Sequence, residues 1–225
     1  MKITYYGHAC FGIELNNTTI IIDPFITGNP LAENIDVNTL KTDYILVTHA
    51  HQDHILDVET IAKNNSALIV SNYEIYLHFT NLGLKAHPLN HGGTFRTDDF
   101  SAKFTAAVHT SSFPDGSYGG EPGGFLLTTK DHSVYIAGDT ALTHDMKLIP
   151  LWTRLDLAIL PIGDNFTMGY QDTVIASDFI ECNKIIGCHY DTFPPIKISK
   201  QEAQKAFKEK GKELILLDIG DSYSM

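Results

Sequence analysis

The chain has 225 residues, of which 43% are hydrophobic and 19% charged, a balance typical of a soluble globular protein. Its formal net charge is −11 and no basic face stands out, which disfavours a nucleic-acid partner. No apolar run is long enough to span a bilayer, and the three cysteines (Cys10, Cys182 and Cys188) form no paired motif, so we expect a cytoplasmic protein without a membrane partner and with reduced, buried thiols.

Strand-like and helix-like segments alternate in the first part of the chain. Short apolar runs predict strands at Ile3–Tyr6, Phe11–Leu15, Thr19–Ile22, Tyr44–Val47 and Ala67–Val70. The last two runs are continuously apolar, as is typical of strands buried on both faces. Helical spacing of apolar residues predicts helices at Ile55–Lys63 and Tyr73–Asn81, the second of which ends before Gly83.

The segment Gly92–Thr129 differs, because turns rich in glycine and proline separate its short apolar runs. We therefore expect antiparallel hairpins there and an exposed loop at Ser111–Gly124. Farther along, the patterns predict strands at Ser133–Ala137, Leu155–Leu160, Lys184–Gly187 and Leu214–Leu217. Helices are predicted at Thr143–Thr153, at Tyr170–Cys182, and between the capping box that starts at Ser199 and the stop at Gly211.

This order of elements indicates an α/β protein in which two sheets face each other with helices outside. A doubly wound nucleotide-binding sheet is not indicated, because no glycine-rich phosphate loop is present. No low-complexity linker divides the chain, so we expect a single domain over residues 1–225. The oligomeric state is left open, a homo-oligomer included.

The most informative stretch of the sequence follows the strand-like run Tyr44–Val47. It places three histidines and one aspartate within six residues: His49, His51, Asp53 and His54. Imidazole and carboxylate are the ligands that zinc and other borderline divalent ions prefer. Four donors in so short a segment are too many for a single ion, so the loop predicts two adjacent metal sites.

Three further donors follow predicted strands in the same way: His109, Asp139 and His189. Loops at strand ends converge to build sites, so these seven donors can supply two ions. We expect two divalent transition-metal ions, zinc first, although manganese, iron and nickel accept the same donors. Gly138 would let the backbone come close behind Asp139.

The donor set resembles the signature of the metallo-β-lactamase superfamily, His-x-His-x-Asp-His followed by His, Asp and His. The resemblance implies that superfamily's fold, a four-layer αβ/βα sandwich of two facing mixed sheets. It assigns one ion to His49, His51 and His109 and the other to Asp53, His54 and His189, with Asp139 bridging the two. It also implies that Asp53 orients the attacking water. A second-site cysteine, common in true lactamases, has no match here, so antibiotic hydrolysis is not expected.

A closer resemblance is to compact metal-dependent hydrolases of the ascorbate-phosphate lactonase-like group. It rests on the segments Gly7–Phe11, Ile22–Pro24, Gly138–Thr140 and Leu160–Gly163. Within that group, His189–Pro194 and Asn165–Gly169 resemble a family of small bacterial and archaeal hydrolases. One departure is Asp164, where we expect a glycine before the asparagine.

The implied function is metal-dependent hydrolysis of a small, anionic ester, lactone, thioester or phosphodiester. A binuclear site would supply metal-bound hydroxide, because paired divalent ions lower the pKa of a shared water from about 15.7 towards 7. The expected partner is therefore a small-molecule substrate. Two alternatives stay open: a di-iron redox protein of the same fold, and a metal-bound protein without catalysis.

Four residues outside the signature are weaker candidates. His8 either reaches the site as a catalytic, substrate-side group or is a core histidine. Asp23 either accepts a hydrogen bond from a ligand imidazole or caps a turn before the next proline. Asn165 and Tyr190 are candidates for substrate contact, although the sequence gives no geometry for either.

Overall fold

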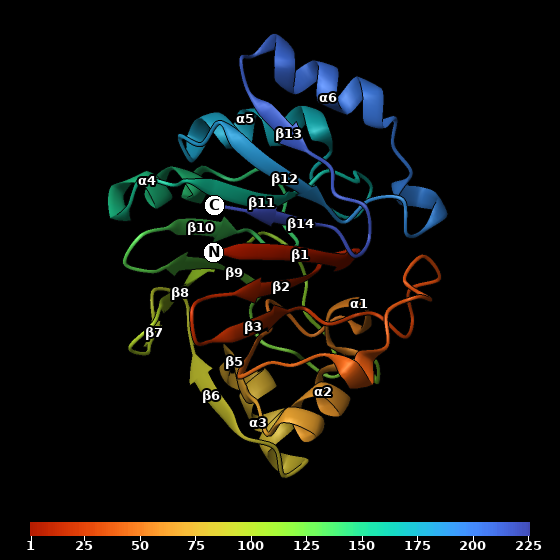
Figure 1. Cartoon of the computed structure of the whole chain (residues 1–225), viewed down its shortest axis with the longest axis vertical. Helices are drawn as coiled ribbons and strands as arrows, with labels where there is room; N and C mark the ends of the chain where they lie inside the picture. The colour runs from red at the N-terminus through yellow and green to blue at the C-terminus, as the bar shows by residue number, and fades with distance from the viewer.

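The computed structural model describes residues 1–225 as two facing β-sheets with helices on their outer sides (Figure 1). Each sheet has seven strands, in the order β14-β1-β2-β3-β4-β5-β6 and β13-β12-β11-β10-β9-β8-β7. The strands of the first sheet are β1 (Lys2–Gly7), β2 (Cys10–Glu14), β3 (Thr19–Ile22), β4 (Tyr44–Leu46), β5 (Leu68–Asn72), β6 (Ala86–Leu89) and β14 (Ser222–Ser224). Those of the second are β7 (Thr94–Arg96), β8 (Ser101–Ala106), β9 (Gly123–Thr128), β10 (Ser133–Ile136), β11 (Leu157–Pro161), β12 (Lys184–Cys188) and β13 (Glu213–Ile215). The sandwich of two mixed sheets predicted from the sequence is confirmed.

The helices lie in two sets, one against each sheet. The first set is η1 (Val37–Thr39), α1 (Gln52–Ile55), α2 (Val58–Asn65) and α3 (Tyr73–Asn81). The second set is η2 (His144–Leu148), α4 (Ile149–Trp152), α5 (Tyr170–Phe179), η3 (Pro194–Ile196) and α6 (Lys200–Glu209). Figure 1 shows α2 and α3 at one end of the molecule and α5 and α6 at the other. None of these helices combines the length and apolar character that crossing a lipid bilayer requires.

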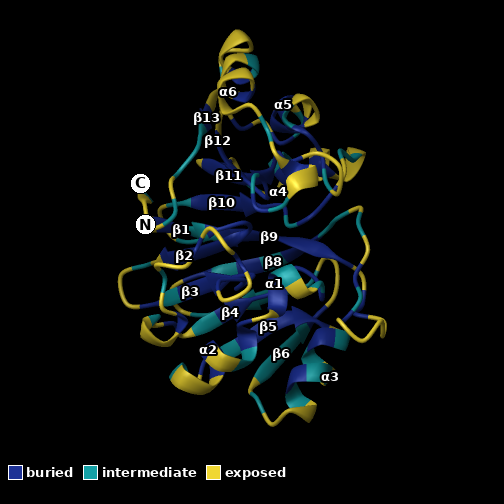
Figure 2. Cartoon of the chain, turned by 90° about the vertical axis from the view of Figure 1, so that its right-hand side faces the viewer, coloured by how far each residue is buried: buried dark blue, intermediate teal, exposed yellow.

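Three apolar layers hold the elements together. The central layer lies between the sheets and contains Phe11, Phe104 and Phe125. One outer layer joins the second sheet to its helices through residues such as Phe207, and the other joins the first sheet to its helices through residues such as Phe79. In Figure 2 the strands are mostly buried, while the outward sides of α2, α5 and α6 are exposed. Burial of both faces of each sheet explains why so many strands are continuously apolar.

Both sheets change from antiparallel to parallel pairing partway across. Strands β1, β2 and β3 pair antiparallel, whereas β3 to β6 pair parallel. In the same way β8, β9 and β10 pair antiparallel, whereas β10 to β13 pair parallel. Loops after the C-terminal ends of parallel strands meet at one edge, and this arrangement positions the site described below.

Three sequence predictions differ from the structure. The helix expected at Ile55–Lys63 starts only at Val58, because α1 stops at Ile55 and the chain turns at Asp57. The helix expected at Thr143–Thr153 is a 3₁₀ segment followed by a new α-helical turn, since Pro150 lacks the N–H that a continuing helix needs. Within the loop expected to be exposed, Ser111 and Phe113 are buried. The three cysteines are buried and free, as predicted.

Candidate metal centre

The structure brings the seven predicted donors together at one edge of the sandwich. The four donors of the signature segment lie between β4 and the end of α1: His49, His51, Asp53 and His54. His109 follows β8, Asp139 follows β10 and His189 directly follows β12. The second sheet thus contributes three donors and the first sheet four, so the centre joins the two sheets.

Asp139 lies at the middle of this group. Its Oδ2 atom is 2.9 Å from Nε2 of His189 and 3.4 Å from Nε2 of His54. The same oxygen is 3.6 Å from Nε2 of His109 and 4.0 Å from Nε2 of His49. One buried carboxylate oxygen therefore lies within 4.0 Å of four imidazole nitrogens from both sheets.

Besides Asp139, two clusters of donor atoms correspond to the predicted sets, and a third cluster, of Asp23, His49 and His54, overlaps both. Atoms of His49, His51 and His109 lie within 4.8 Å of one another, and so do atoms of Asp53, His54 and His189 together with His8. Apart from His8, these are the two sets that the superfamily resemblance implies. Asp53 Oδ2 is 3.9 Å from His54 Nε2 and 3.8 Å from His189 Nε2.

The chemistry of the donors fits divalent cations. Nε2 of His54 is fully buried and has no hydrogen-bond partner, which is costly for a polar atom unless a ligand takes its lone pair. His49 Nε2 and His51 Nδ1 face each other at 3.1 Å, so their lone pairs repel unless a proton or a cation lies close to both. Borderline divalent ions that accept imidazole and carboxylate together suit this arrangement.

The pKa values at the centre point in the same direction. Burial would raise the pKa of both carboxyls, but the neighbouring histidines outweigh it and hold the pKa of Asp53 and of Asp139 well below the usual range. Burial lowers the pKa of His49, so that its imidazole is neutral. At His54 and His189 burial also lowers the pKa, but Asp139 outweighs it and raises both values, that of His189 to about 9. The centre therefore attracts positive charge, which metal cations provide in place of protons.

Asp23 supports the centre from behind His54. Its Oδ2 accepts hydrogen bonds from His54 Nδ1 at 2.8 Å and from the Thr48 hydroxyl at 2.6 Å, and its Oδ1 accepts from the Thr48 N–H at 2.8 Å. A carboxylate can only accept, so Nδ1 of His54 donates its proton to Asp23, and Nε2 can give its lone pair to a metal ion that takes the place of a second proton. Of the two interpretations of Asp23 that the sequence left open, the structure favours the support of a histidine.

His8 is buried beneath Asp53 rather than exposed to the substrate side. Its Nε2 is 3.0 Å from Asp53 Oδ2, and its Nδ1 is 3.0 Å from the Thr192 hydroxyl. Burial lowers the pKa of His8 to about 4, so the ring is neutral. Because Asp53 only accepts, Nε2 of His8 donates to it and Nδ1 accepts from Thr192. Both nitrogens are thus occupied, and this geometry favours positioning of Asp53 over contact with a substrate.

Several residues of the centre hold an uncommon backbone conformation. His8, Asp23 and His189 have positive φ angles of 56°, 43° and 55°. Side chains other than glycine adopt this region only when surrounding contacts enforce it, and such strain gathers at functional sites. One such contact is the hydrogen bond of 2.8 Å from the His189 N–H to the His8 carbonyl, which joins a loop of the first sheet to a loop of the second.

The backbone at Gly138 and at Asp164 adopts a conformation that favours glycine. Gly138 has a φ of +64°, and a Cβ there would lie 2.6 Å from the Gly123 carbonyl oxygen, so the expected close approach behind Asp139 is present. Asp164 and Asn165 have φ angles of 61° and 55°, a region that glycine adopts without strain, so the glycine that the resemblance led us to expect at position 164 would suit this turn.

The other two candidates for substrate contact lie apart from the cavity. Asn165 is exposed in the turn beside Asp164, whereas Tyr190 is buried in the outer core of the second sheet. Neither side chain is among those that line the cavity next to the donors.

That cavity opens directly above the donors and has a volume of about 680 Å³, within the usual range for small-molecule sites. Five of the seven donors line it: His51, Asp53, His109, Asp139 and His189. Three phenylalanines complete its wall: Phe113, Phe166 and Phe193. These aromatic residues were not predicted as part of the site, because they belong to three loops that are far apart in the chain.

Comparison with known proteins gives consistent matches over the whole length. Residues 2–189 match the family model described as beta-lactamase superfamily domain. A protein of Christiangramia forsetii named UPF0173 metal-dependent hydrolase is 60% identical over 226 residues, which covers 100% of both chains. The structure of Igni18, a metallo hydrolase from the archaeon Ignicoccus hospitalis, superposes with a TM-score of 0.90 at 31% identity and covers 100% of this chain and 98% of its own. CmlA, a diiron beta-hydroxylase from Streptomyces venezuelae, shares the fold alone, with a TM-score of 0.75 at 14% identity over 100% of this chain and 54% of CmlA.

Proposed function

The chain belongs to the beta-lactamase superfamily, and from this premise we propose that it is a metal-dependent hydrolase with two divalent transition-metal ions in its active site. The observation that carries the proposal is the position of Asp139 Oδ2, within 4.0 Å of four imidazole nitrogens. A carboxylate between two groups of histidines suits a pair of ions better than one. The names of the relatives, all metal-dependent hydrolases, support the reaction class.

The two ions are assigned to the donors by their proximity. We assign one ion to His49, His51 and His109 and the other to Asp53, His54 and His189, with Asp139 shared. Zinc is the first choice for an all-imidazole and carboxylate set, and manganese, iron and nickel are the other candidates. Bound ions of this kind lower the pKa of a coordinated water and polarise the substrate oxygen under attack.

The protein side chains have separate tasks in the proposed reaction. Asp53 lines the cavity and is anionic at neutral pH, so it can accept a hydrogen bond from the attacking water and orient it towards the substrate. His8 donates to Asp53 and thereby fixes the direction of that carboxylate. Asp23 does the same for the imidazole of His54. The bonds that we propose for cleavage are those of a small ester, lactone, thioester or phosphodiester.

A redox role of the kind named for CmlA is not proposed. The donors would accept iron, but the likeness to CmlA is one of fold, and this chain covers only 54% of that protein. The relatives of high identity are named hydrolases instead.

A panel of esters, lactones, thioesters and phosphodiesters tests the proposal with the zinc- or manganese-loaded protein. We expect turnover that disappears on chelation and returns on addition of metal. Asp53→Asn should lower kcat/KM by about 10²-fold or more, the scale of a lost acid–base group. Equal turnover before and after chelation, or none by the loaded protein on any member of the panel, would contradict the proposal.

A further inference from the structure

One part of the cavity wall is apolar. It is formed by Phe113, Phe166 and Phe193 together with Pro114 and Pro195. These residues come from the loops that follow β8, β11 and β12, so three separate segments converge on one apolar surface. Aromatic side chains supply large contact areas to a ligand at a low entropic cost.

Phe166 is held in the cavity wall although half of it is in contact with solvent. Its side chain is 51% exposed, while the turn that presents it is closed by the paired Gly163 and Gly169 and by a hydrogen bond of 2.6 Å from the Phe166 N–H to the Asp164 carbonyl. These backbone contacts position the turn, and the exposed phenylalanine that it carries at the cavity gains burial when a ligand with an apolar surface enters.

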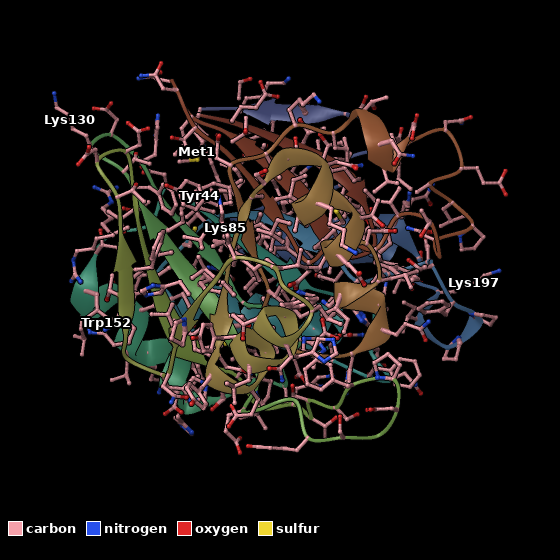
Figure 3. The ribbon with its side chains drawn as sticks, turned by 90° about the horizontal axis from the view of Figure 1, so that it is seen from below. Met1, Tyr44, Lys85, Lys130, Trp152 and Lys197 are labelled. Carbon is pink, nitrogen blue, oxygen red and sulfur yellow. The ribbon has the colours of Figure 1, made fainter.

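The same wall carries no cationic side chain. No lysine or arginine lines the cavity, and the polar lining residues other than the donors are uncharged: Gln52, Thr110 and Ser112. Lys197, two positions after Pro195, lies on the outer edge of the molecule (Figure 3). A carboxylate or phosphate on the remote part of a substrate would therefore lose water without gaining a charged partner.

The charge of the whole chain works in the same direction. The formal net charge of −11, which two bound divalent ions would change to about −7, disfavours the approach of anions at long range, while those ions make the donor centre itself locally positive. An uncharged substrate meets no such barrier. The apolar wall and the net charge thus oppose an anionic group on the remote part of the substrate, whereas we expected an anionic substrate from the sequence.

We propose that this cavity selects an uncharged carboxylic ester or lactone whose remote part is apolar and about as large as a phenyl ring or a short alkyl chain. The inference rests on the proposed hydrolase function and names the substrate class for that site. The reacting carbonyl faces the donors, while the apolar part lies against Phe113, Phe166 and Phe193. Phe166 is the specificity-determining residue that can be changed with least risk to the fold, because it is exposed.

Two esters with the same six-carbon acyl chain, which ends in a methyl group in one and in a carboxylate in the other, test the proposal with the metal-loaded protein: p-nitrophenyl hexanoate and p-nitrophenyl hydrogen adipate. We expect kcat/KM to be at least about tenfold higher for the neutral hexanoate. Phe166→Ala should raise KM for the hexanoate about 3- to 10-fold with a smaller change in kcat, the scale of a lost aromatic contact. Phe166→Lys should shift the ratio of the two kcat/KM values towards the adipate by about tenfold. Trp152→Ala is the matched control, because Trp152 is a 45% exposed aromatic residue outside this cavity and at the edge of the molecule in Figure 3.

The proposal is overturned if the adipate is cleaved as efficiently as the hexanoate, or if the Phe166 variants behave like Trp152→Ala. A binding measurement separates this failure from a failure of the hydrolase function. Isothermal titration with two ketones that hydrolysis does not cleave, butyrophenone and 3-benzoylpropionate, reports the preference of the cavity without turnover. Tighter binding of butyrophenone supports the selection for apolar ligands even if neither ester is cleaved, whereas equal or weaker binding contradicts it.

Discussion

At the scale of single residues, the centre depends on side chains outside the signature segment. Asp23 fixes the ring of His54, and His8 fixes the carboxylate of Asp53 while Thr192 holds His8 from the other side. Histidine ligands are commonly oriented by such acceptors, and their loss weakens metal binding although no ligand is removed.

Asp23→Asn isolates this support from the ligands themselves. Asparagine has nearly the same size and tolerates the positive φ of 43°, but its NH₂ group cannot accept a hydrogen bond from His54 or from Thr48. We expect the affinity for the ions to fall about 10- to 100-fold while the protein stays folded. A competition titration against a chelating dye measures this change.

Asp43→Asn is the matched control for Asp23→Asn. Asp43 accepts hydrogen bonds from the N–H and hydroxyl of Thr19, at 2.8 and 3.1 Å, but it precedes β4 and so lies at the end of that strand opposite to the donors. Its variant should bind metal normally. Unchanged affinity in Asp23→Asn would show that Asp23 serves only the turn before Pro24.

At the scale of elements, the local sequence pattern was sufficient to predict a helix or strand where residues close in the chain determine it. Helix α3 has the predicted bounds, Tyr73–Asn81, because Asn72 caps it and its apolar residues keep helical spacing. Strands β6 and β14 were not predicted, since Pro88 interrupts one and polar residues dominate the other, and each is a strand only through its partner in the sheet. The donors were found from motif spacing, whereas the pairing of His8 with Thr192 spans 184 positions and needs the folded chain.

Helix α2 ends at a residue with a left-handed backbone. Ser66 closes the helix with a φ of 54°, its N–H bonds to the Ala62 carbonyl, and its side chain is exposed. Because a left-handed backbone costs most residues roughly 1–2 kcal/mol, Ser66→Gly should stabilise the protein by up to about 1 kcal/mol after the greater entropy of glycine in the unfolded chain is counted. The melting temperature should then rise by about 2–4 °C. Ser66→Val should lower the melting temperature, because a β-branched residue is strained in this backbone conformation. A valine variant as stable as the glycine variant would contradict the left-handed conformation of residue 66.

At the scale of the whole molecule, one apolar layer is shared by both sheets. Phe11 and Ile22 from the first sheet pack in the same layer as Phe104, Phe125 and Ile159 from the second. A core of this kind is complete without metal ions, unlike that of a zinc finger, whose folding requires the metal. That residues 1–225 form a single domain is still a prediction, and thermal unfolding can test it.

Removal of the ions should lower stability without unfolding the protein. We expect a single thermal transition with and without a strong chelator, because neither sheet can bury its inner face alone. Ligands present at about 100 times their dissociation constant stabilise by about 2.7 kcal/mol each, so the melting temperature should fall by roughly 5–10 °C per ion lost. Circular dichroism measures both features. Two separate transitions would contradict the prediction of a single domain. Loss of the fold on chelation at room temperature would contradict the prediction that the core is stable without metal ions.

Anomalous X-ray diffraction can count and locate the bound ions. Crystals of the zinc-loaded protein, measured at the zinc absorption edge, reveal each bound ion as a peak in the anomalous difference map. We expect two peaks a few ångströms apart, one beside His49, His51 and His109 and the other beside Asp53, His54 and His189, with Asp139 between them. A single peak at the centre, or a second peak bound through His8, would contradict it.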